Sequence, residues 1–394
     1  MASKSRTENS SVVLVLGAGA SMAYGPPVMN AFMDVARRRY FQRQRTDNAL
    51  TECYEELLTF HEYCRGSSWA FKRNWDNMEE LYTQADLLRL SAPASEADAA
   101  RERCQRIAWT IWDVYRACDP KSFQFAEICG KVIETGYHPV VITTNYDLLC
   151  ELSLKARNKS VSYPGFSSEA ICSGDAKCHA QLGDSEASGA EPPNSVPVIK
   201  LHGSANWFSL RGEWYAFDDC AYLSGDIHFP DLPRRLKTVA DRPGNSPPSA
   251  DSNGAVAEVE PAIIPPMLGK SSANRVIASQ WNRAIEELSR ARQIWVVGYS
   301  FPTTDMFMTR LLTQGVQNNF DLDGFYIVDT APWDTWKPRL DEMVGTMLRK
   351  RTWFINLRAA QVFGTMFGNR ADQWFLHISR VHERLAQSPP FQLE

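Results

Sequence analysis

The sequence predicts an α/β fold: a Rossmann-like parallel sheet with helices on both faces, plus a helical insertion. Short apolar runs rich in β-branched residues predict buried strands at Val12–Leu16, Val140–Thr143, Val198–Leu201, Ile294–Val297 and Phe325–Asp329. Most of these runs are followed by a helical pattern, and strands joined by helical crossovers run parallel. The stretch between the first two strands is helical almost throughout, which predicts the insertion.

The first strand leads directly into a glycine-rich turn and then a helix from Val28 to about Phe41. Glycines let the backbone approach a ligand closely, and free N–H groups at such a turn attract phosphate. The turn departs from the dehydrogenase fingerprint, because Met22 occupies the third glycine position. A plain strand-to-helix turn is the alternative, but strand, small residues and helix together favour nucleotide binding. The residues predicted to bind the nucleotide are Gly17, Ala18, Gly19 and Ser21.

The insertion is expected at about residues 47–136. Apolar residues at three- and four-residue spacing predict helices at Leu50–Cys64, Met78–Leu90, Arg101–Ala117 and Phe123–Thr135. The acidic segment Asn77–Leu81 suits a helix start. It could also help line a cleft, but helix capping is the favoured explanation.

The central strand Val140–Thr143 stops abruptly at Thr144, Asn145 and Asp147. In an open α/β sheet, polar groups at the carboxyl end of a strand face the crevice where ligands bind. Asn145 and Asp147 are therefore candidates for catalysis. Both residue types also favour helix caps, so capping of the helix at Leu148–Ala156 is the alternative explanation.

The next strand ends at His202, a residue type that titrates near neutral pH and can act as a general base. A hydrogen-bonded structural histidine is the alternative. Asn206–Leu210 and Glu213–Phe217 then predict a hairpin, and residues 261–266 a strand bounded by prolines.

Two later strand ends complete the predicted site. Ile294–Val297 is followed by Gly298 and Ser300, and Phe325–Asp329 ends on an acid that suits a ribose hydroxyl. In a parallel sheet all these strand ends lie on one edge. A glycine turn, an amide, a carboxylate and a histidine on one edge suit a dinucleotide that is cleaved at its sugar.

We expect residues 12–330 to form one domain, with surface loops at about 167–197 and 235–258 because these stretches are rich in Ser, Gly and Pro. Residues 331–394 should add a C-terminal extension packed on the same domain, with an edge strand at Trp353–Ile355 and a helix at Asp372–Leu385.

The composition is ordinary for a soluble globular protein, with 394 residues, 44% hydrophobic and 22% charged. The net charge of −4 gives no global attraction to nucleic acid, and we expect no direct nucleic-acid binding. The polar segment 1–11 and the short apolar runs predict a cytoplasmic chain without membrane contact. The nine cysteines form no Cys-x-x-Cys pair, so no metal is expected.

These motifs, in their order along the chain, resemble those of the sirtuin-like superfamily. The motifs are Gly17-Ala18-Gly19-Ala20-Ser21, Thr143-Thr144-Asn145-Tyr146-Asp147, Leu201-His202-Gly203 and Gly298-Tyr299-Ser300. In sirtuins the corresponding motifs are Gly-Ala-Gly-x-Ser, Thr-Gln-Asn-x-Asp, His-Gly and Gly-Thr-Ser. The Thr-Thr-Asn-Tyr-Asp and Gly-Tyr-Ser-x-Pro-x-x-Asp forms are closest to the sirtuin-like domain of bacterial anti-phage defence proteins, whose activity is NAD⁺ hydrolysis.

The chain also departs from sirtuin deacylases. Their glycine turn is followed by Ile-Pro-Asp-Phe-Arg, whereas this chain has Pro26-Pro27-Val28-Met29-Asn30, and it lacks their four-cysteine zinc module. The resemblance therefore implies hydrolysis of NAD⁺ as a substrate, with Asn145 orienting ribose and water, His202 as general base and Asp147 as electrostatic support. A non-catalytic module that senses NAD⁺ or ADP-ribose is the alternative. Residual deacylation or ADP-ribosyl transfer is disfavoured by the missing residues.

The resemblance also implies external control, because a free NADase would poison its own cell. The expected partners are NAD⁺ and either further copies of the chain or a separately encoded activator. In this family such activators include ATPases or helicases, Argonaute-type proteins and phage components.

Overall fold

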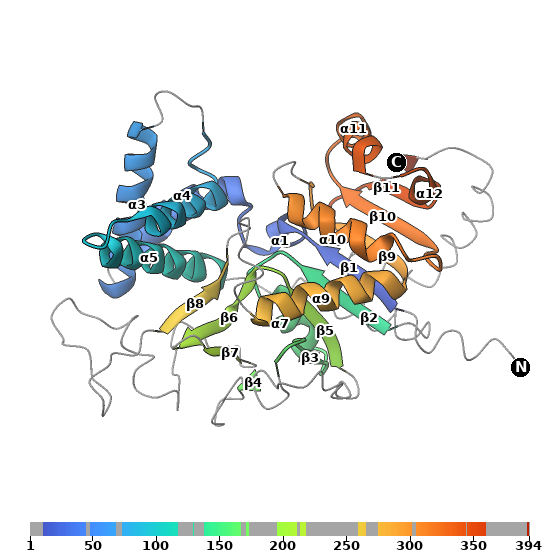
Figure 1. Cartoon of the computed structure of the whole chain (residues 1–394), viewed down its shortest axis with the longest axis horizontal. Coiled ribbons are helices and arrows are strands. Elements are labelled where there is room, and N and C mark those ends of the chain that lie inside the picture. The colour runs from blue at the N-terminus through green and yellow to red at the C-terminus, as the bar shows by residue number, and fades with distance from the viewer. Residues whose placement is uncertain are drawn as a thin grey trace, which may run out of the picture.

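The computed structural model describes residues 11–44, 48–67, 73–116, 129, 138–166, 171–172, 195–210, 213–217, 259–264, 275–301, 305–343, 345–359 and 392–393. Its main feature is an eight-stranded sheet in the order β12-β11-β10-β9-β1-β2-β5-β3 (Figure 1). The strands are β1 (Ser11–Leu16), β2 (His138–Thr143), β3 (Ser160–Ser162), β5 (Ser195–Lys200), β9 (Ala291–Val297), β10 (Gly324–Asp329), β11 (Thr352–Asn356) and β12 (Gln392–Leu393). All neighbouring strands pair in parallel.

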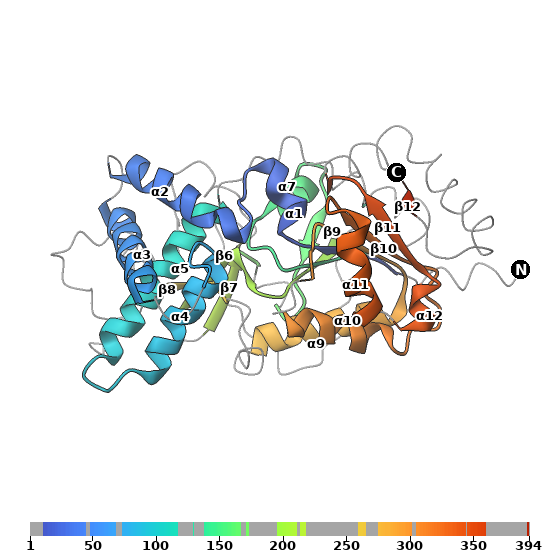
Figure 2. The ribbon, with the colours of Figure 1, turned by 90° about the horizontal axis from the view of Figure 1, so that it is seen from above.

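Helices cover both faces of this sheet, which explains why its central strands are mostly apolar. All six residues of β1 are buried. Val13 and Val15 pack with α9 (Arg275–Arg290) and α10 (Met306–Val316), whereas Leu14 and Leu16 belong to a core that includes α7 (Leu149–Lys155). Figure 2 shows α7 on one side of the sheet and α9 and α10 on the other. The predicted Rossmann-like parallel sheet with helices on both faces is confirmed.

The chain between β1 and β2 contains a group of helices beside the sheet (Figures 1 and 2). They are α1 (Ala18–Ser21), α2 (Phe32–Arg43), α3 (Asn48–Ser67), α4 (Met78–Ser91) and α5 (Ala97–Arg116), with two short 3₁₀ turns at Met22–Tyr24 and Met29–Ala31. Of the predicted helix at Phe123–Thr135, only Cys129 is among the described residues. We refer to α3, α4 and α5 as the helical insertion.

A buried ion-pair network joins α2 to the helical insertion. Asp113 of α5 has no exposed side-chain surface and accepts hydrogen bonds from Arg43 of α2 at 2.7 Å and Arg116 at 2.8 Å. Tyr54 of α3 donates to the same carboxylate at 2.9 Å. Burial disfavours the charged carboxylate, but the three nearby arginines, led by Arg116, leave the pKa of Asp113 below its usual value.

A second, four-stranded sheet lies between the insertion and the main sheet, in the order β4-β7-β6-β8. Its strands are β4 (Ile171–Cys172), β6 (Gly203–Leu210), β7 (Glu213–Phe217) and β8 (Val259–Ile263). β6 and β7 pair antiparallel, as predicted for a hairpin. Trp112 of α5 donates from Nε1 to the carbonyl of Ala205 in β6 at 2.8 Å, which fixes the insertion to this sheet.

The carboxyl-terminal part differs from the prediction in one respect. The predicted edge strand at Trp353–Ile355 is present as β11, but β12 pairs outside it. α11 (Trp333–Met343) and α12 (Thr346–Arg349) lie between β10 and β11. The predicted helix at 372–385, the loop at 235–258 and most of the loop at 167–197 lie outside the described residues. Among the residues described, no helix is long and apolar enough to cross a bilayer.

Candidate active site

The carboxyl ends of the four central strands lie side by side. Leu16, the last residue of β1, is in register with Thr143 of β2 on one side and with Val297 of β9 on the other. Thr143 in turn pairs with Lys200 at the end of β5. From β1 the chain first adds β2, β5 and β3 on one side of the sheet and later adds β9, β10 and β11 on the other side. The strand order therefore reverses at β1. Ligands of open α/β sheets bind outside the strand ends at such a switch point.

The two glycine turns meet at this switch point, backbone against backbone. Gly17 N donates to Val297 O at 3.0 Å, and Gly19 N donates to Gly298 O at 2.9 Å. A Cβ on Gly17 would lie 2.6 Å from Gly298 O, and a Cβ on Gly298 would lie 2.2 Å from Ala20 N. Gly298 also has a φ of +62°. Only glycine fits both positions, so the turns are built for close backbone contact.

Asn145 connects the central strand to the first glycine turn. Its side-chain Nδ2 donates to Gly17 O and to Ser21 Oγ, each at 2.9 Å. Its backbone N donates to Thr143 Oγ1 at 3.0 Å. The side chain is only 7% exposed, and Oδ1 has no hydrogen-bond partner among the described residues. A buried acceptor without a partner is costly, which indicates a position where a ligand or water can donate to it.

Asp147 bonds to the start of the following helix from one residue before the N-cap, Leu148. Its Oδ1 accepts from Leu149 N, at the first residue of α7, at 3.1 Å. Burial raises the pKa of Asp147, while the positive charge of Lys200 and the hydrogen bonds from Ser21 and Leu149 act in the opposite direction. Asp147 therefore stabilises the loop after β2 and the start of α7. A role for it in catalysis stays a prediction.

Lys200 orders the same loop from the next strand, and the sequence prediction missed it. The side chain is 1% exposed, and Nζ donates to the carbonyls of Asn145 and Asp147 and lies 3.0 Å from Glu151 Oε1 of α7. The sequence signal that could have indicated a buried lysine is its position inside the apolar strand Val198–Leu201. A charged residue is seldom fully buried unless it is paired.

His202 follows Lys200 and Leu201 at the end of β5 and is 5% exposed. Its Nε2 is buried without a hydrogen-bond partner among the described residues. The ring lies edge-on to that of Trp281, with 6.2 Å between the centroids. Burial lowers the pKa of His202 to about 4, against an opposing effect of the Asp305 carboxylate. The imidazole is therefore neutral at pH 7, as a proton acceptor requires.

Three further side chains, Asp305, Tyr299 and Glu79, were not predicted as site residues, and the Asp305 charge acts on His202. Asp305 caps α10 by accepting from Met308 N at 3.0 Å and also accepts a hydrogen bond from Tyr299 OH. The Asp305 charge influences the pKa of His202 and of Glu79, the second residue of α4. Asp305 could have been found from the Gly-Tyr-Ser-x-Pro-x-x-Asp form. The placement of Glu79 depends on packing of the insertion, which no local pattern specifies.

The other predicted ligand-binding residues occupy the same edge with different surroundings. Ala18 and Thr144 are half-buried, and Thr144 N donates to Leu16 O at 3.2 Å. Ser300 is exposed, and its carbonyl accepts from Arg339. Asp329 ends β10, which β9 separates from β1, and its Oδ1 accepts from Ala331 N at 2.7 Å. Binding of a ligand by these four residues stays a prediction.

Residues 139–240 match the family model described as the SIR2-like domain, a stretch that contains Asn145, Asp147 and His202. Over this stretch the chain is similar to SIR2-like domains, in agreement with the sirtuin-like superfamily that its motifs resemble.

Two solved structures show a distant likeness. One, described as a Sir2 homolog–NAD complex, is 14% identical and has a TM-score of 0.42, with 96% of this chain and 93% of that chain covered. The other, described as showing the mechanism and regulation of Sir2 enzymes, is 11% identical and has a TM-score of 0.38, with 95% of each chain covered. No curated protein matches the sequence.

Within the described part of the chain, no group of three or more His, Cys, Asp or Glu side chains could hold a metal ion.

Proposed function

We propose that the chain is an NAD⁺ glycohydrolase that releases nicotinamide and ADP-ribose. One observation carries this proposal: Asn145 Oδ1 and His202 Nε2 are both buried without a partner among the described residues, on adjacent strand ends beside the glycine turns. A ligand with hydroxyl donors would satisfy both atoms. The SIR2-like match over these residues supports NAD⁺ as that ligand.

In the proposed reaction, the bond between ribose C1′ and the nicotinamide nitrogen breaks, and the electron pair leaves with nicotinamide. Positive charge develops on the ribose, and the oxygen of a water molecule bonds to C1′ and loses a proton. Asn145 Oδ1 orients the ribose and the water. His202 accepts the proton, a contribution typically worth about 10² to 10⁴ in rate. The remaining acceleration comes from positioning and from stabilisation of the cationic charge.

The glycine turns suit the pyrophosphate of the dinucleotide. Gly17, Gly19 and Gly298 let the two turns pack backbone against backbone, so that a ligand at the switch point would meet main-chain groups of both. We assign Gly17, Ala18, Gly19, Ser21, Thr144, Gly298, Ser300 and Asp329 to dinucleotide binding in this proposal.

The test is incubation of the purified chain with NAD⁺ and measurement of nicotinamide by chromatography. Asn145→Ala and His202→Ala should each lower the rate by at least about 100-fold. Phe320→Ala, at a residue that is 83% exposed, is the matched control and should keep the wild-type rate. Undiminished activity in both site variants would contradict the assignment. Tight NAD⁺ or ADP-ribose binding with no turnover would favour a sensing module instead.

The proposal includes a role as the effector of a bacterial anti-phage defence system. In that role the enzyme depletes NAD⁺ once it is triggered. Such an enzyme has to be silent in the healthy cell, so we also propose control by assembly of copies of the chain or by a separately encoded protein. The same NAD⁺ assay, run with and without the protein encoded next to it and across chain concentrations, tests this control.

A further inference from the structure

Trp281 joins helix α9 to the end of β5. It lies on the apolar side of α9 with Ile277 and Ala284, at the three- and four-residue spacing of one helix face. Its indole Nε1 donates to the carbonyl of Leu201, the residue before His202, at 3.1 Å. Because Trp281 belongs to the helix and is bonded to the strand end, its ring has a fixed place beside His202.

The main chain around His202 is held from two further sides. Lys200 N donates to the side-chain Oε1 of Gln280, the residue before Trp281, at 2.9 Å. Ile264 N, which follows β8, donates to the carbonyl of His202 at 2.9 Å. The backbone of this strand end therefore has little freedom, and the freedom that remains to His202 is rotation of its side chain.

The indole of Trp281 lies edge-on to the imidazole of His202. The ring centroids are 6.2 Å apart and the ring planes meet at 63°. Nε2 of the imidazole is buried without a hydrogen-bond partner among the described residues. Contact with Trp281 can therefore set the angle of the ring while Nε2 stays available to a ligand.

The indole is itself supported from α10. The ring of Phe307, the second residue of α10, lies 6.0 Å from that of Trp281 at an interplanar angle of 67°. Trp281 also packs against buried residues of the cores on both faces of the main sheet. Aromatic rings prefer such edge-to-face arrangements. The tilt of the imidazole at the strand end thus depends on an indole that two helices hold in place.

We propose that Trp281 is a positioning residue that sets the orientation of the His202 imidazole and keeps water away from it. The inference rests on the proposed function, in which His202 accepts a proton during hydrolysis of NAD⁺. Trp281 acts through His202 and takes no part in bond breaking. A proton acceptor has to lie within about 2.6–3.2 Å of the atom that gives up the proton. Displacement of the ring by about 1 Å can therefore cost about 100-fold in rate.

Exclusion of water by the indole has a consequence for the pH dependence. Burial lowers the pKa of His202 to about 4, against the effect of the Asp305 carboxylate at the start of α10. The neighbours Trp281 and Ile264 carry no charge. Loss of the indole would admit water and raise the pKa of His202 toward its ordinary value of about 6.5. A protonated imidazole accepts no proton, so such a variant should lose activity as the pH falls from about 6.5 to 5, whereas the wild type should not.

The experiment measures NAD⁺ hydrolysis by the full chain carrying substitutions of Trp281. Trp281→Leu should lower kcat by about 10- to 100-fold and change KM by less than about twofold. Trp281→Phe keeps an aromatic ring beside His202 and should retain at least about a third of kcat. The matched control is Trp353→Leu in β11, which should keep the wild-type kcat. Trp353 is also partly buried against the same core, but β10, β9, β1 and β2 lie between it and β5.

A double variant separates positioning from a general effect on the fold. In the His202→Ala background, Trp281→Leu should cause no further loss of kcat, because the residue through which it acts is gone. A further loss equal to that in the wild-type background would show that Trp281 acts on the fold as a whole and would overturn the proposal.

Nuclear magnetic resonance of the histidine-labelled chain is a second measurement that needs no turnover. His202→Gln identifies the signals of His202. These signals should not titrate between pH 5 and 8 in the wild type or in Trp353→Leu, and should titrate with a midpoint of about 6 in Trp281→Leu. The wild type should also show cross-relaxation between the ring protons of His202 and Trp281, which needs no variant of Trp281 to fold.

The outcomes separate this proposal from the proposed function. Unchanged kcat in Trp281→Leu, or absence of cross-relaxation in the wild type, overturns the positioning role while hydrolysis stands. A shifted His202 titration in Trp281→Leu, in a chain that releases no nicotinamide, supports the hold of Trp281 on the imidazole and overturns the hydrolase. Loss of kcat in Trp281→Phe as large as in Trp281→Leu would show that ring contact is not what positions His202.

Discussion

His202 lies at the carboxyl end of β5 with 5% of its surface exposed, and burial lowers its pKa from 6.5 to about 4. Its imidazole therefore stays neutral, and able to accept a proton, throughout the range from pH 5 to 8. Because His202 is not protonated in this range, we expect no loss of NAD⁺ hydrolysis from its titration between pH 5 and 8. The pKa of His202 is lower in the folded chain than in the unfolded chain, so the stability of the fold depends on pH.

Between pH 6.5 and pH 4 the unfolded chain binds a proton at His202 that the folded chain does not, so this residue makes stability fall as the pH falls. By pH 5 the loss should be about 2 kcal/mol. Urea unfolding of wild type and His202→Gln at pH 7.5 and pH 5 measures it. The variant should lose less stability than the wild type on acidification, and an equal loss in both would show that His202 is not protected from protons.

Residue patterns in the sequence indicated Asn145, Asp147 and His202 because each follows an apolar strand directly. The structure places all three at one edge, and the Asp147 side chain accepts a hydrogen bond from Leu149 N at the start of α7. Lys200 was missed because a lysine within a strand resembles a residue on an exposed face. Its burial depends on Glu151 and on two loop carbonyls, which come together only in the folded chain.

At the scale of the elements, the two strand-to-helix turns after β1 and β9 form a single unit. Gly298 has a φ of +62° and contacts the backbone at Ala20, so neither the conformation nor the space accepts a side chain. Gly345 is the matched control, because a Cβ there would meet nothing within 4 Å and its φ is −63°.

We expect Gly298→Ala to destabilise the chain by about 2 kcal/mol or more and to abolish nucleotide binding, because the first glycine turn has to move. Gly345→Ala should remain within about 0.5 kcal/mol of the wild type. Thermal unfolding and calorimetric titration with NAD⁺ measure both effects. Similar melting temperatures for the two variants would mean that the two glycine turns can move apart without a loss of folding free energy.

Strands and helices of the parallel sheet were largely predictable, because buried parallel strands are continuous apolar runs and their crossovers are amphipathic helices. The position of β12 outside β11 was not, since a two-residue strand has no periodic pattern. The shared core of α4, α5 and the loop after β2 could not be predicted either. It depends on Met78, Tyr115 and Tyr146, which are far apart in the sequence.

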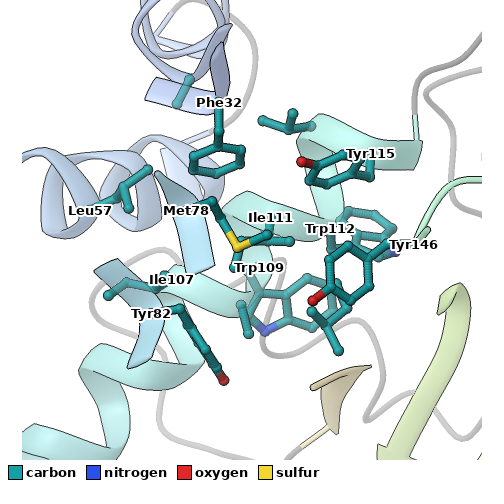
Figure 3. Close-up of a cluster of buried hydrophobic side chains, with 14 of the residues drawn as sticks. Phe32, Leu57, Met78, Tyr82, Ile107, Trp109, Ile111, Trp112, Tyr115 and Tyr146 are labelled. Atoms are coloured by element: carbon teal, nitrogen blue, oxygen red, sulfur yellow. The ribbon is translucent and has the colours of Figure 1, made fainter. Parts of the chain in front are cut away.

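For the whole molecule, the helical insertion shares a hydrophobic core with the second sheet and with the loop after β2. The cluster in Figure 3 contains Ile107, Trp109 and Trp112 of α5 together with Tyr146. Ala205 N donates to Tyr146 O, and Ala205 O accepts from Trp112, each at 2.8 Å. The insertion therefore cannot open without disturbing the loop that carries Asn145.

Native-state hydrogen exchange should show this coupling. Backbone amides of α5 and β2 should exchange with the same free energy of opening, because the two elements unfold as one cooperative unit. Amides of the short helix α12 should exchange more easily and serve as the internal reference. Exchange of α5 at a clearly lower free energy than β2 would mean that the insertion opens by itself.

Tyr146 has a consequence for how this chain could be engineered or could diverge. The residue belongs to the motif of the site by sequence, yet its side chain is part of the helical cluster in Figure 3. Replacing the helical insertion by that of another chain would leave Tyr146 packed against foreign side chains. Its neighbours in sequence, Asn145 and Asp147, would then be disturbed as well. A successful swap of the helical insertion therefore has to carry position 146 along with the helices.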